Sequence, residues 1–389
     1  MTKPPTVSLL IETASAYGRG LLRGIAHYAR LHGPWSLEVE PGGLEDPGPM
    51  LRKGKVQGII ALMRTPRLAE RILAVRIPTV DLDHALPGLF PWPVVNDELK
   101  VGRLAADHLM SCGLRRFAFC GWTQPGRRNG FWWECRRLEG FTETIEKAGY
   151  EVDCHAPVRS TSGGIPVPEQ KRLARWLSRL PKPVGLLAAN DQRGRHVLEA
   201  ARLAGVRVPD ELAVIGVDND EVLCEMSTPS LSSVDLDARR VGFEGAAALD
   251  RLMRGKPAPK RPVVIEPLGV IARRSTDVLA IEDDLVVAAL RFIRAHNQKP
   301  IRVKDVLDTV SVSRKTLEIK FLRFLGRTPY SEIQRVRLLN VVDLLTRTDW
   351  PLKKISAATG FACVQHLHSA FRRLAGMTPT KYRARNSGL

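Results

Sequence analysis

The pattern of apolar residues changes once along this chain of 389 residues, near residue 283. Residues 6–271 alternate short apolar runs, such as TVSLLIE and LAVIGV, with longer segments such as RLAERILAV that repeat apolar residues at helical spacing. Strands that alternate with helices across short loops form βαβ units, and a continuous apolar strand suits a parallel sheet covered on both faces. From residue 283 onward the pattern is helical throughout. The sequence therefore predicts an α/β part followed by an all-α part.

The boundaries of these parts follow from the same pattern. We predict an α/β domain at 1–275, a linker at 276–284 and an all-α domain at 285–389. The chain has no apolar run of about 18 residues and no segment that looks like a secretion signal, so we expect a cytoplasmic protein with no membrane partner. Its six cysteines are scattered without a C-x-x-C pair, which favours reduced thiols over disulfides.

Positive charge is concentrated at the end of the sequence. The formal net charge is +18, and residues 282–389 hold 20 Lys or Arg against 9 Asp or Glu, so this part supplies +11 of it. A dense positive field suits nucleic acid or another polyanion. The alternative is a solvated charged surface without a specific partner.

Two short units recur within the all-α part. Each has a short helical segment, a three-residue turn and a longer helical segment: VKDVLDTV, SVS, RKTLEIKFLRFLG in the first, and LKKISAATG, FAC, VQHLHSAFRRLAG in the second. Ser313 is placed to cap the longer helix of the first unit, and Gly360 and Gly376 are placed where helices end. This plan is the helix-turn-helix, whose second helix enters the major groove of DNA.

The longer helix of the second unit contains residues that could suggest a metal site. Cys363, His366 and His368 lie within six residues. At 100° per residue the two histidines point about 200° apart, and only i, i+4 spacing would bring them to one ion. Cys363 falls near the apolar stripe and is interpreted as a packed thiol. We therefore predict no metal site.

The same helical geometry selects residues that could face DNA. In the second unit the apolar stripe is Leu367, Ala370, Phe371 and Leu374, and in the first it is Leu317, Phe321, Phe324 and Leu325. The opposite faces carry polar groups that suit base edges and phosphates. The candidate DNA-contacting residues are Arg314, Lys315, Glu318, Gln365, His366, Ser369, Arg372 and Arg373.

The end of the sequence resembles the DNA-binding domains of AraC/XylS-type regulators. The resemblance rests on ISAATGF and on HLHSAFRRLAGMTPTKYR, together with LGRTPYSEIQRVRL in the first unit. It implies two helix-turn-helix units in successive major grooves of double-stranded operator DNA, with residues 314–319 and 364–369 reading bases. Ile319 and Val364 thereby join the candidates. The family often has Arg at the position of Ile319, which could instead touch a thymine methyl or only pack at the rim.

The α/β part resembles LacI-type regulators and periplasmic sugar-binding proteins. The residues that carry this resemblance are AAND, the segment LAGVRVPDELAVIGVDND and STPSLSSV. It implies two doubly wound lobes joined by crossing strands, with a sugar held between them, and a homodimer. LacI-type regulators carry a DNA-binding unit before this domain. Here Val7 already begins the first predicted strand, so we expect the DNA-binding unit at the other end of the chain.

Candidate effector-binding residues lie near the ends of predicted strands or near the Arg position of the LacI-like pattern. They are Tyr17, Trp132, Arg137, Asn190, Asp191 and Asp218. Carboxylates, amides and guanidinium groups suit pairs of sugar hydroxyls, and aromatic rings suit a sugar's C–H face. Other roles stay open: Asp191 as a helix cap, Asp218 in a turn, Arg137 in a surface ion pair, and Trp132 in the core or a dimer interface.

The order of the two parts, across the whole chain, resembles the XylR-type xylose operon regulators. This implies a pentose effector, D-xylose above others, and activation through RNA polymerase. Alternatives are a repressor, a different monosaccharide or no ligand. An enzyme is not expected: GRGLLRG misses the dinucleotide spacing, and G-x-S-x-G, Walker A and H-E-x-x-H are absent from the sequence. We predict no catalytic residue and no cofactor.

Overall fold

The computed structural model divides into two compact units. One, here the α/β unit, comprises Met1–Leu109 and Arg115–Thr276, and the other, here the helical unit, comprises Met110–Leu114 and Asp277–Leu389. The unit changes at Thr276, where the sequence predicts a linker, but the short segment Met110–Leu114 was not expected in the second unit. The structure describes residues 4–39, 56–83, 85–86, 89–90, 94–123, 131–155, 166–257, 262–278, 283–296, 300–375 and 378–386.

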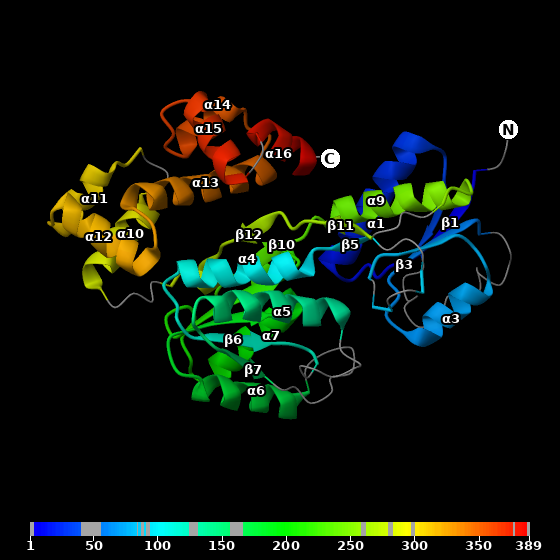
Figure 1. The fold of residues 1–389 in the computed structure, drawn as a ribbon, viewed down its shortest axis with the longest axis horizontal. Helices are drawn as coiled ribbons and strands as arrows, with labels where there is room; N and C mark the ends of the chain where they lie inside the picture. Colours follow the sequence, from blue (N-terminus) through cyan, green and yellow to red (C-terminus); the bar gives the residue numbers. More distant parts are fainter. Residues whose placement is uncertain are drawn as a thin grey trace. The chain divides into compact units, whose positions relative to one another are not determined.

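The first lobe of the α/β unit is a parallel sheet with helices on both faces (Figure 1). Its strand order is β2-β1-β3-β4, with bounds Ser36–Val39, Thr6–Leu10, Gly58–Ala61 and Thr79–Asp81. Successive side chains of a strand point to opposite faces. Leu9 and Ile60 therefore pack toward α1 (Ala16–His32) and α9 (Ala238–Met253), whereas Leu10 and Ile59 pack toward α3 (Pro66–Ala74).

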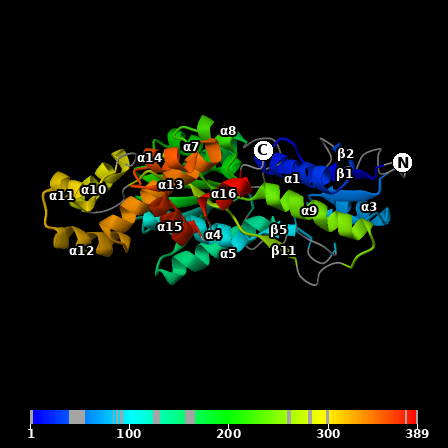
Figure 2. The ribbon, with the colours of Figure 1, turned by 90° about the horizontal axis from the view of Figure 1, so that it is seen from above.

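Helices α1 and α9 lie side by side (Figures 1 and 2). Glycine permits this close approach. A Cβ added at Gly24 would lie 2.0 Å from the carbonyl oxygen of Arg239, and one at Gly242 would lie 2.1 Å from that of Leu21. The helix that follows the second lobe in sequence is thereby fixed to the first lobe.

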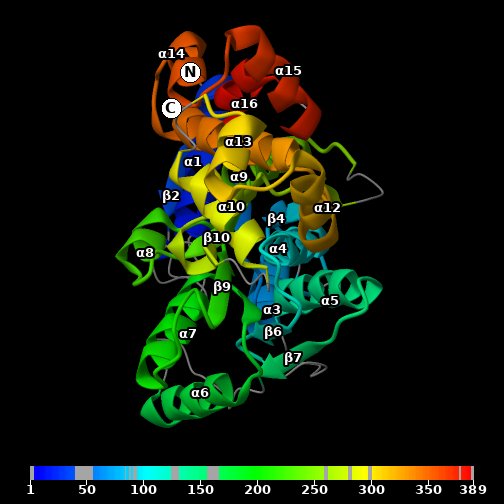
Figure 3. The same cartoon turned by 90° about the vertical axis from the view of Figure 1, so that its left-hand side faces the viewer.

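The second lobe contains a six-stranded sheet of order β12-β10-β9-β8-β6-β7. Helices α6 (Val167–Arg179) and α7 (Asp191–Leu203) pack on one face of it, and α5 (Trp132–Lys147) lies on the other side of β6 (Figure 3). Helix α4 (Glu98–Ser111) precedes β6, and the short helix α8 (Glu221–Met226) follows β9. The strand bounds are Phe117–Cys120 for β6, Val152–His155 for β7, Val184–Ala188 for β8, Leu212–Val217 for β9, Ser232–Asp235 for β10 and Gly269–Ile271 for β12.

Two features of these sheets differ from the sequence prediction. Strand β12 pairs antiparallel with β10, although parallel sheets were predicted. The sequence also did not indicate β7 or β10 as strands, and the last predicted strand is divided into β11 (Val263–Ile265) and β12. Strand β11 pairs with β5 (Val94–Asn96) in a separate two-stranded sheet. The chain passes between the lobes after β5, after β10 and after β11, as the predicted two-lobe fold requires.

The helical unit has two hydrophobic cores joined by one long helix. Helix α13 (Pro329–Arg347) contributes Ile333 and Val336 to the first core and Val341 and Leu345 to the second. The other helices are α10 (Asp284–Ala295), α11 (Val303–Val310), α12 (Arg314–Leu325), α14 (Leu352–Ala358), α15 (Val364–Ala375) and α16 (Pro379–Asn386). Among the described residues, none of the helices is both long and apolar enough to cross a membrane.

Both predicted helix-turn-helix units are confirmed. Helices α11 and α12 form the first, and Ser313 caps α12 by accepting a hydrogen bond from the Thr316 amide. Helices α14 and α15 form the second. Gly360 has a positive φ of 72° at the end of α14, as a helix stop should. Gly376 and the side chain of Leu374 lie outside the described residues.

Candidate functional site

A cavity of about 840 Å³ lies between the two lobes of the α/β unit, here called the cleft. In the first lobe, Glu12, Arg64 and Asp83 follow strands β1, β3 and β4 and line it. In the second lobe, Trp122, Asn190 and Asp218 follow β6, β8 and β9 and line it from the other side. The carboxyl ends of the parallel strands of both lobes therefore face one space, which is where α/β folds bind ligands.

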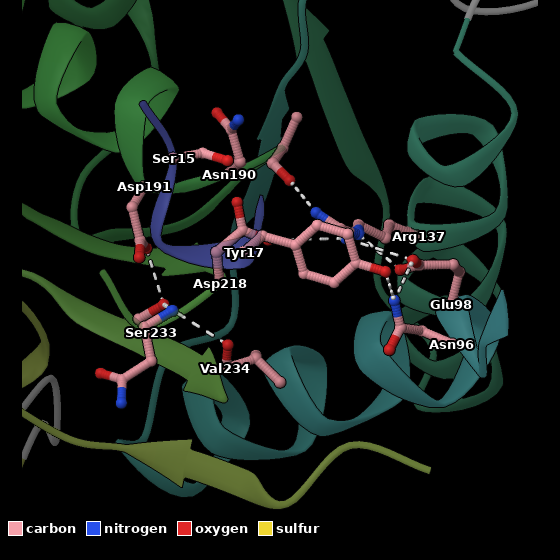
Figure 4. Close-up of polar contacts among 12 residues, drawn as sticks. Ser15, Tyr17, Asn96, Glu98, Arg137, Asn190, Asp191, Asp218, Ser233 and Val234 are labelled. Carbon is pink, nitrogen blue, oxygen red and sulfur yellow. Dashed lines mark hydrogen bonds and ion pairs between the residues drawn. The ribbon is translucent and has the colours of Figure 1, made fainter. Parts of the chain in front are cut away.

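Arg137, on α5, is held by a buried carboxylate (Figure 4). Its Nε donates to Glu98 Oε2 at 2.6 Å, its Nη2 donates to Glu98 Oε1 at 3.3 Å, and its Nη1 donates to the Ala189 carbonyl at 2.7 Å. The guanidinium also lies over the ring of Trp133, 4.6 Å from its centroid. Since Arg137 is only 4% exposed, the alternative of a surface ion pair is wrong. Burial opposes its charge, but Glu98 and Asp218 raise its pKa.

Asp218 combines an unusual backbone with a perturbed carboxyl group. Its φ is +104°, in a region of backbone conformation that residues other than glycine rarely adopt. Its amide donates a hydrogen bond to the Val234 carbonyl at 3.0 Å. Its Oδ1 lies 3.8 Å from Arg137 Nη2. Burial raises the pKa of Asp218 to about 7; Arg137 works in the opposite direction and Glu98 in the same direction. The cleft thus contains a carboxyl group that titrates near neutral pH.

Tyr17 lies at the start of α1 and faces the same group of residues (Figure 4). Asn96 Nδ2 donates to Tyr17 Oη at 2.9 Å, and burial raises the pKa of this phenol. Asn96 Oδ1 is buried and has no hydrogen-bond partner among the residues that the structure describes. Trp132 lines the cleft as a half-buried side chain. Tyr17 and Asn96 thus offer hydrogen-bonding groups, and Trp132 offers an aromatic surface.

Asn190 and Asp191 are adjacent in sequence but have different surroundings. Asn190 caps α7 by accepting from the Arg193 amide at 3.0 Å, and its Oδ1 also accepts from Trp122 Nε1 at 3.1 Å. The suggested cap role of Asp191 is therefore wrong. Asp191 is 1% exposed and accepts from the Asp220 amide at 2.7 Å and from Ser233 Oγ at 2.6 Å (Figure 4). Both of its carboxylate oxygens bind groups of its own lobe.

Sequence reasoning missed several residues of this cleft. The missed residues that bear on ligand binding are Glu12, Arg64, Asp83, Asn96, Glu98 and Trp122. Glu12 and Asp83 directly follow apolar strands, a signal that was available in the sequence. Glu98 was hidden because its ion pair with Arg137 joins residues 39 positions apart.

In the helical unit, the candidate DNA-contacting residues lie on α12 and α15. On α12, Arg314 and Lys315 are exposed, Glu318 accepts from Arg314 Nε at 2.9 Å, and Ile319 is 55% exposed. Leu317 and Phe321 of the same helix are fully buried, as predicted. One outward face of α12 therefore carries all its candidates.

Helix α15 has the same two-sided character. Leu367, Ala370 and Phe371 pack in the core. Val364 is half-buried, and the other candidates are exposed: Gln365, His366, Ser369, Arg372 and Arg373. Cys363 precedes the helix and is half-buried. In the described parts of the chain there is no group of three His, Cys, Asp or Glu residues that could hold a metal ion.

The fold, the cleft and the two helix-turn-helix units define a DNA-binding transcription regulator with a periplasmic-binding-protein-like domain. Residues 106–276 match the family model of a periplasmic binding protein-like domain, and residues 306–385 match that of a helix-turn-helix domain. The predicted fold class is thereby confirmed.

Relatives that match almost the whole chain identify the family. The xylose operon regulatory protein of Haemophilus influenzae is 30% identical over 383 residues, which cover 97% of each chain. That of Escherichia coli K12 is 31% identical over 399 residues, covering 99% of this chain and 98% of the relative. A solved structure of the xylose-binding transcription activator xylR covers 99% of both chains, with 29% identity and a TM-score of 0.62. The chain belongs to the family of xylose operon regulatory proteins.

Proposed function

We propose that the cleft of the α/β unit binds D-xylose or a closely related pentose, and that this binding alters how the helical unit engages operator DNA. The observation that best supports this proposal is that polar residues at the strand ends of both lobes line one cavity of about 840 Å³. Charged and amide groups alternate there with the rings of Trp122, Trp132 and Trp133. Such a lining suits a polyhydroxylated ring, and the names of the relatives point to xylose.

The cleft residues have separable roles in this proposal. Asp218, Asn190 and Tyr17 contact sugar hydroxyls, and Trp132 covers a C–H face of the ring. Arg137 contributes its outer edge, because Glu98 and Ala189 already hold most of its donors. Asp191 supports the site from behind through Asp220 and Ser233.

Sugar binding is tested by calorimetry of the full chain against D-xylose, L-arabinose, D-ribose and D-glucose. We expect saturable binding of at least one pentose, and D-xylose to bind most tightly. A protein that binds none of the four would refute the effector proposal. A hexose that binds most tightly would support the alternative of a different monosaccharide.

In the helical unit, α12 and α15 are proposed to enter successive major grooves of double-stranded operator DNA. Their exposed polar faces carry this part of the proposal. We further infer a cytoplasmic homodimer that activates transcription through RNA polymerase and catalyses no reaction, in line with relatives that are transcription regulators. Footprinting on operator DNA with and without D-xylose tests whether the sugar controls how the helical unit binds DNA. Protection that is the same in both conditions would contradict control by the sugar.

A further inference from the structure

Helix α12 carries two exposed aliphatic side chains on its outward face, here the Ile319–Leu322 pair. Among the described residues of the helical unit, the exposed large apolar side chains are Ile319, Leu322 and Tyr330, and the first two belong to α12. Ile319 is 55% exposed and Leu322 is 51% exposed. At 100° per residue both point away from Leu317 and Phe321, which are fully buried on the opposite side of the helix. The pair therefore contributes little to the core of the unit.

Helix α15 carries polar side chains at the places that correspond to the Ile319–Leu322 pair. Both helices have 12 residues, α15 begins 50 positions after α12, and each buries a Leu and a Phe at the same places along its length. This correspondence puts Ser369 at the position of Ile319 and Arg372 at the position of Leu322, and both of these α15 residues are exposed. The two helix-turn-helix units therefore share a plan but present different chemical groups outward.

Positively charged side chains border the pair. Lys315 lies one helical turn before Ile319, Arg323 lies one turn after it, and both are exposed. The acidic neighbour Glu318 accepts a hydrogen bond from Arg314 Nε at 2.9 Å, so a cation lies beside its negative charge. An apolar centre with a positive rim suits the major groove of DNA, because phosphates flank the groove on both sides.

An aliphatic side chain can recognise one kind of group in the major groove. The side chain of Ile319 has no hydrogen-bonding atom, so it cannot bind the donors and acceptors on base edges. The apolar group that base edges present in this groove is the 5-methyl group of thymine. Contact between the two removes apolar surface of both from water, which stabilises the complex.

We propose that Ile319 is a specificity-determining residue that contacts the 5-methyl group of a thymine in the DNA segment that α12 enters, and that Leu322 shields this contact from water. The proposal rests on the proposed function, because it assumes that α12 lies in a major groove. It adds that the first unit depends on thymine methyl groups, whereas α15 offers hydrogen-bonding groups at the same two places. Leu322 stands where α15 has Arg372, so it adds no phosphate contact.

The test uses the full chain and the DNA sequence that it selects from a random pool, with and without D-xylose. Each thymine of that sequence is replaced in turn by deoxyuridine, which lacks only the 5-methyl group. The variants are Ile319→Ala and Leu322→Ala. Leu203→Ala is the matched control, since Leu203 is an aliphatic residue of the α/β unit that is 63% exposed. Fluorescence anisotropy gives the dissociation constant for each DNA, and urea unfolding checks that each variant folds.

For the wild type we expect replacement of one particular thymine to weaken binding by about fourfold, the factor that corresponds to one buried methyl-sized group. In Ile319→Ala the same replacement should have no measurable effect, because the side chain that contacts the methyl group is gone. In Leu322→Ala its effect should fall to about twofold, while the dependence of binding on salt stays that of the wild type. Leu203→Ala should keep the wild-type response to every replacement.

The outcomes separate this inference from the proposed function. If the wild type selects no DNA sequence under either condition, both are wrong. If the wild type binds its selected sequence but tolerates every replacement, only the methyl contact is wrong. An Ile319→Ala variant that keeps the wild-type response to each replacement also overturns it. If that variant does so and fails to activate transcription, the pair binds a protein partner instead of a base.

Discussion

Removing the carboxylate of Glu98 should destabilise the α/β unit far more than removing a surface carboxylate. Glu98 is 5% exposed and accepts two hydrogen bonds from Arg137, which is itself 4% exposed. In Glu98→Ala the buried guanidinium would keep the Ala189 carbonyl, the Trp133 ring and the carboxylate of Asp218, 3.8 Å away, but would lose both hydrogen bonds to Glu98. Breaking a buried pair by removing one partner costs about 3–5 kcal/mol. Because Asp218 lies close enough to compensate in part, we expect a value near 3 kcal/mol.

The assay is urea unfolding of the full chain, with hydrogen exchange of α4 and α5 peptides to assign the loss to this unit. The matched control is Glu143→Ala. Glu143 pairs with Arg103 at 3.4 Å, but both side chains are more than a third exposed, so its removal should cost at most about 1 kcal/mol. If Glu98→Ala unfolds at the same urea concentration as Glu143→Ala, the argument that this buried pair stabilises the unit is refuted.

Three further predictions concern pH and DNA. Between about pH 4 and 7, the raised pKa keeps Asp218 protonated in the folded protein, whereas the same carboxyl group is ionised in the unfolded chain. The bound proton therefore stabilises the fold, and this stabilisation is lost as pH rises through that window. Asp218→Asn should remove this part of the pH dependence of urea unfolding. The same variant should no longer respond to sugar, but in gel shifts without sugar it should bind the operator as the wild type does. Burial alone would raise the pKa of Glu332, but Arg335 and Arg327 outweigh it and lower this pKa to about 2. The shift corresponds to about 3 kcal/mol of stability. This stability is present above about pH 4.5 and is lost as pH falls toward 2. Glu332→Gln should therefore unfold more easily than wild type by about 3 kcal/mol at pH 7 and by about half as much at pH 3, and a gap that does not depend on pH would contradict this. Arg372→Ala should weaken binding to operator and to unrelated DNA alike and reduce the salt slope of log K by about 1; a slope equal to that of wild type would remove Arg372 from the phosphate contacts.

The helix-turn-helix units could be predicted from the sequence because their determinants are local. The stripe of Leu367, Ala370 and Phe371 follows from a repeat of 3.6 residues, and the same repeat leaves Gln365 and Ser369 exposed. Ser313 likewise caps the helix that begins at the next residue. Helical geometry also separates His366 from His368 without any knowledge of the tertiary fold.

The α/β unit was only partly predictable, because some of its determinants are not local in the sequence. Apolar runs indicated most strands, but β7 (Val152–His155) reads VDCH and lacks such a run. The reversed direction of β12 depends on where the chain returns to the second lobe. Nothing in the sequence near β10 or β12 indicates that these two strands pair.

Sequence by itself determined the order of the two parts, the two helix-turn-helix units and the place of several cleft residues at strand ends. Tertiary structure alone decided how those cleft residues are used. Arg137 is held by Glu98, 39 residues away, and the carboxylate of Asp191 binds its own lobe through Ser233. Arg64 meets Asp83 because β3 and β4 are neighbours. Ion pairs and hydrogen bonds act over a few ångströms, so their partners are fixed only when the sheets bring distant residues together.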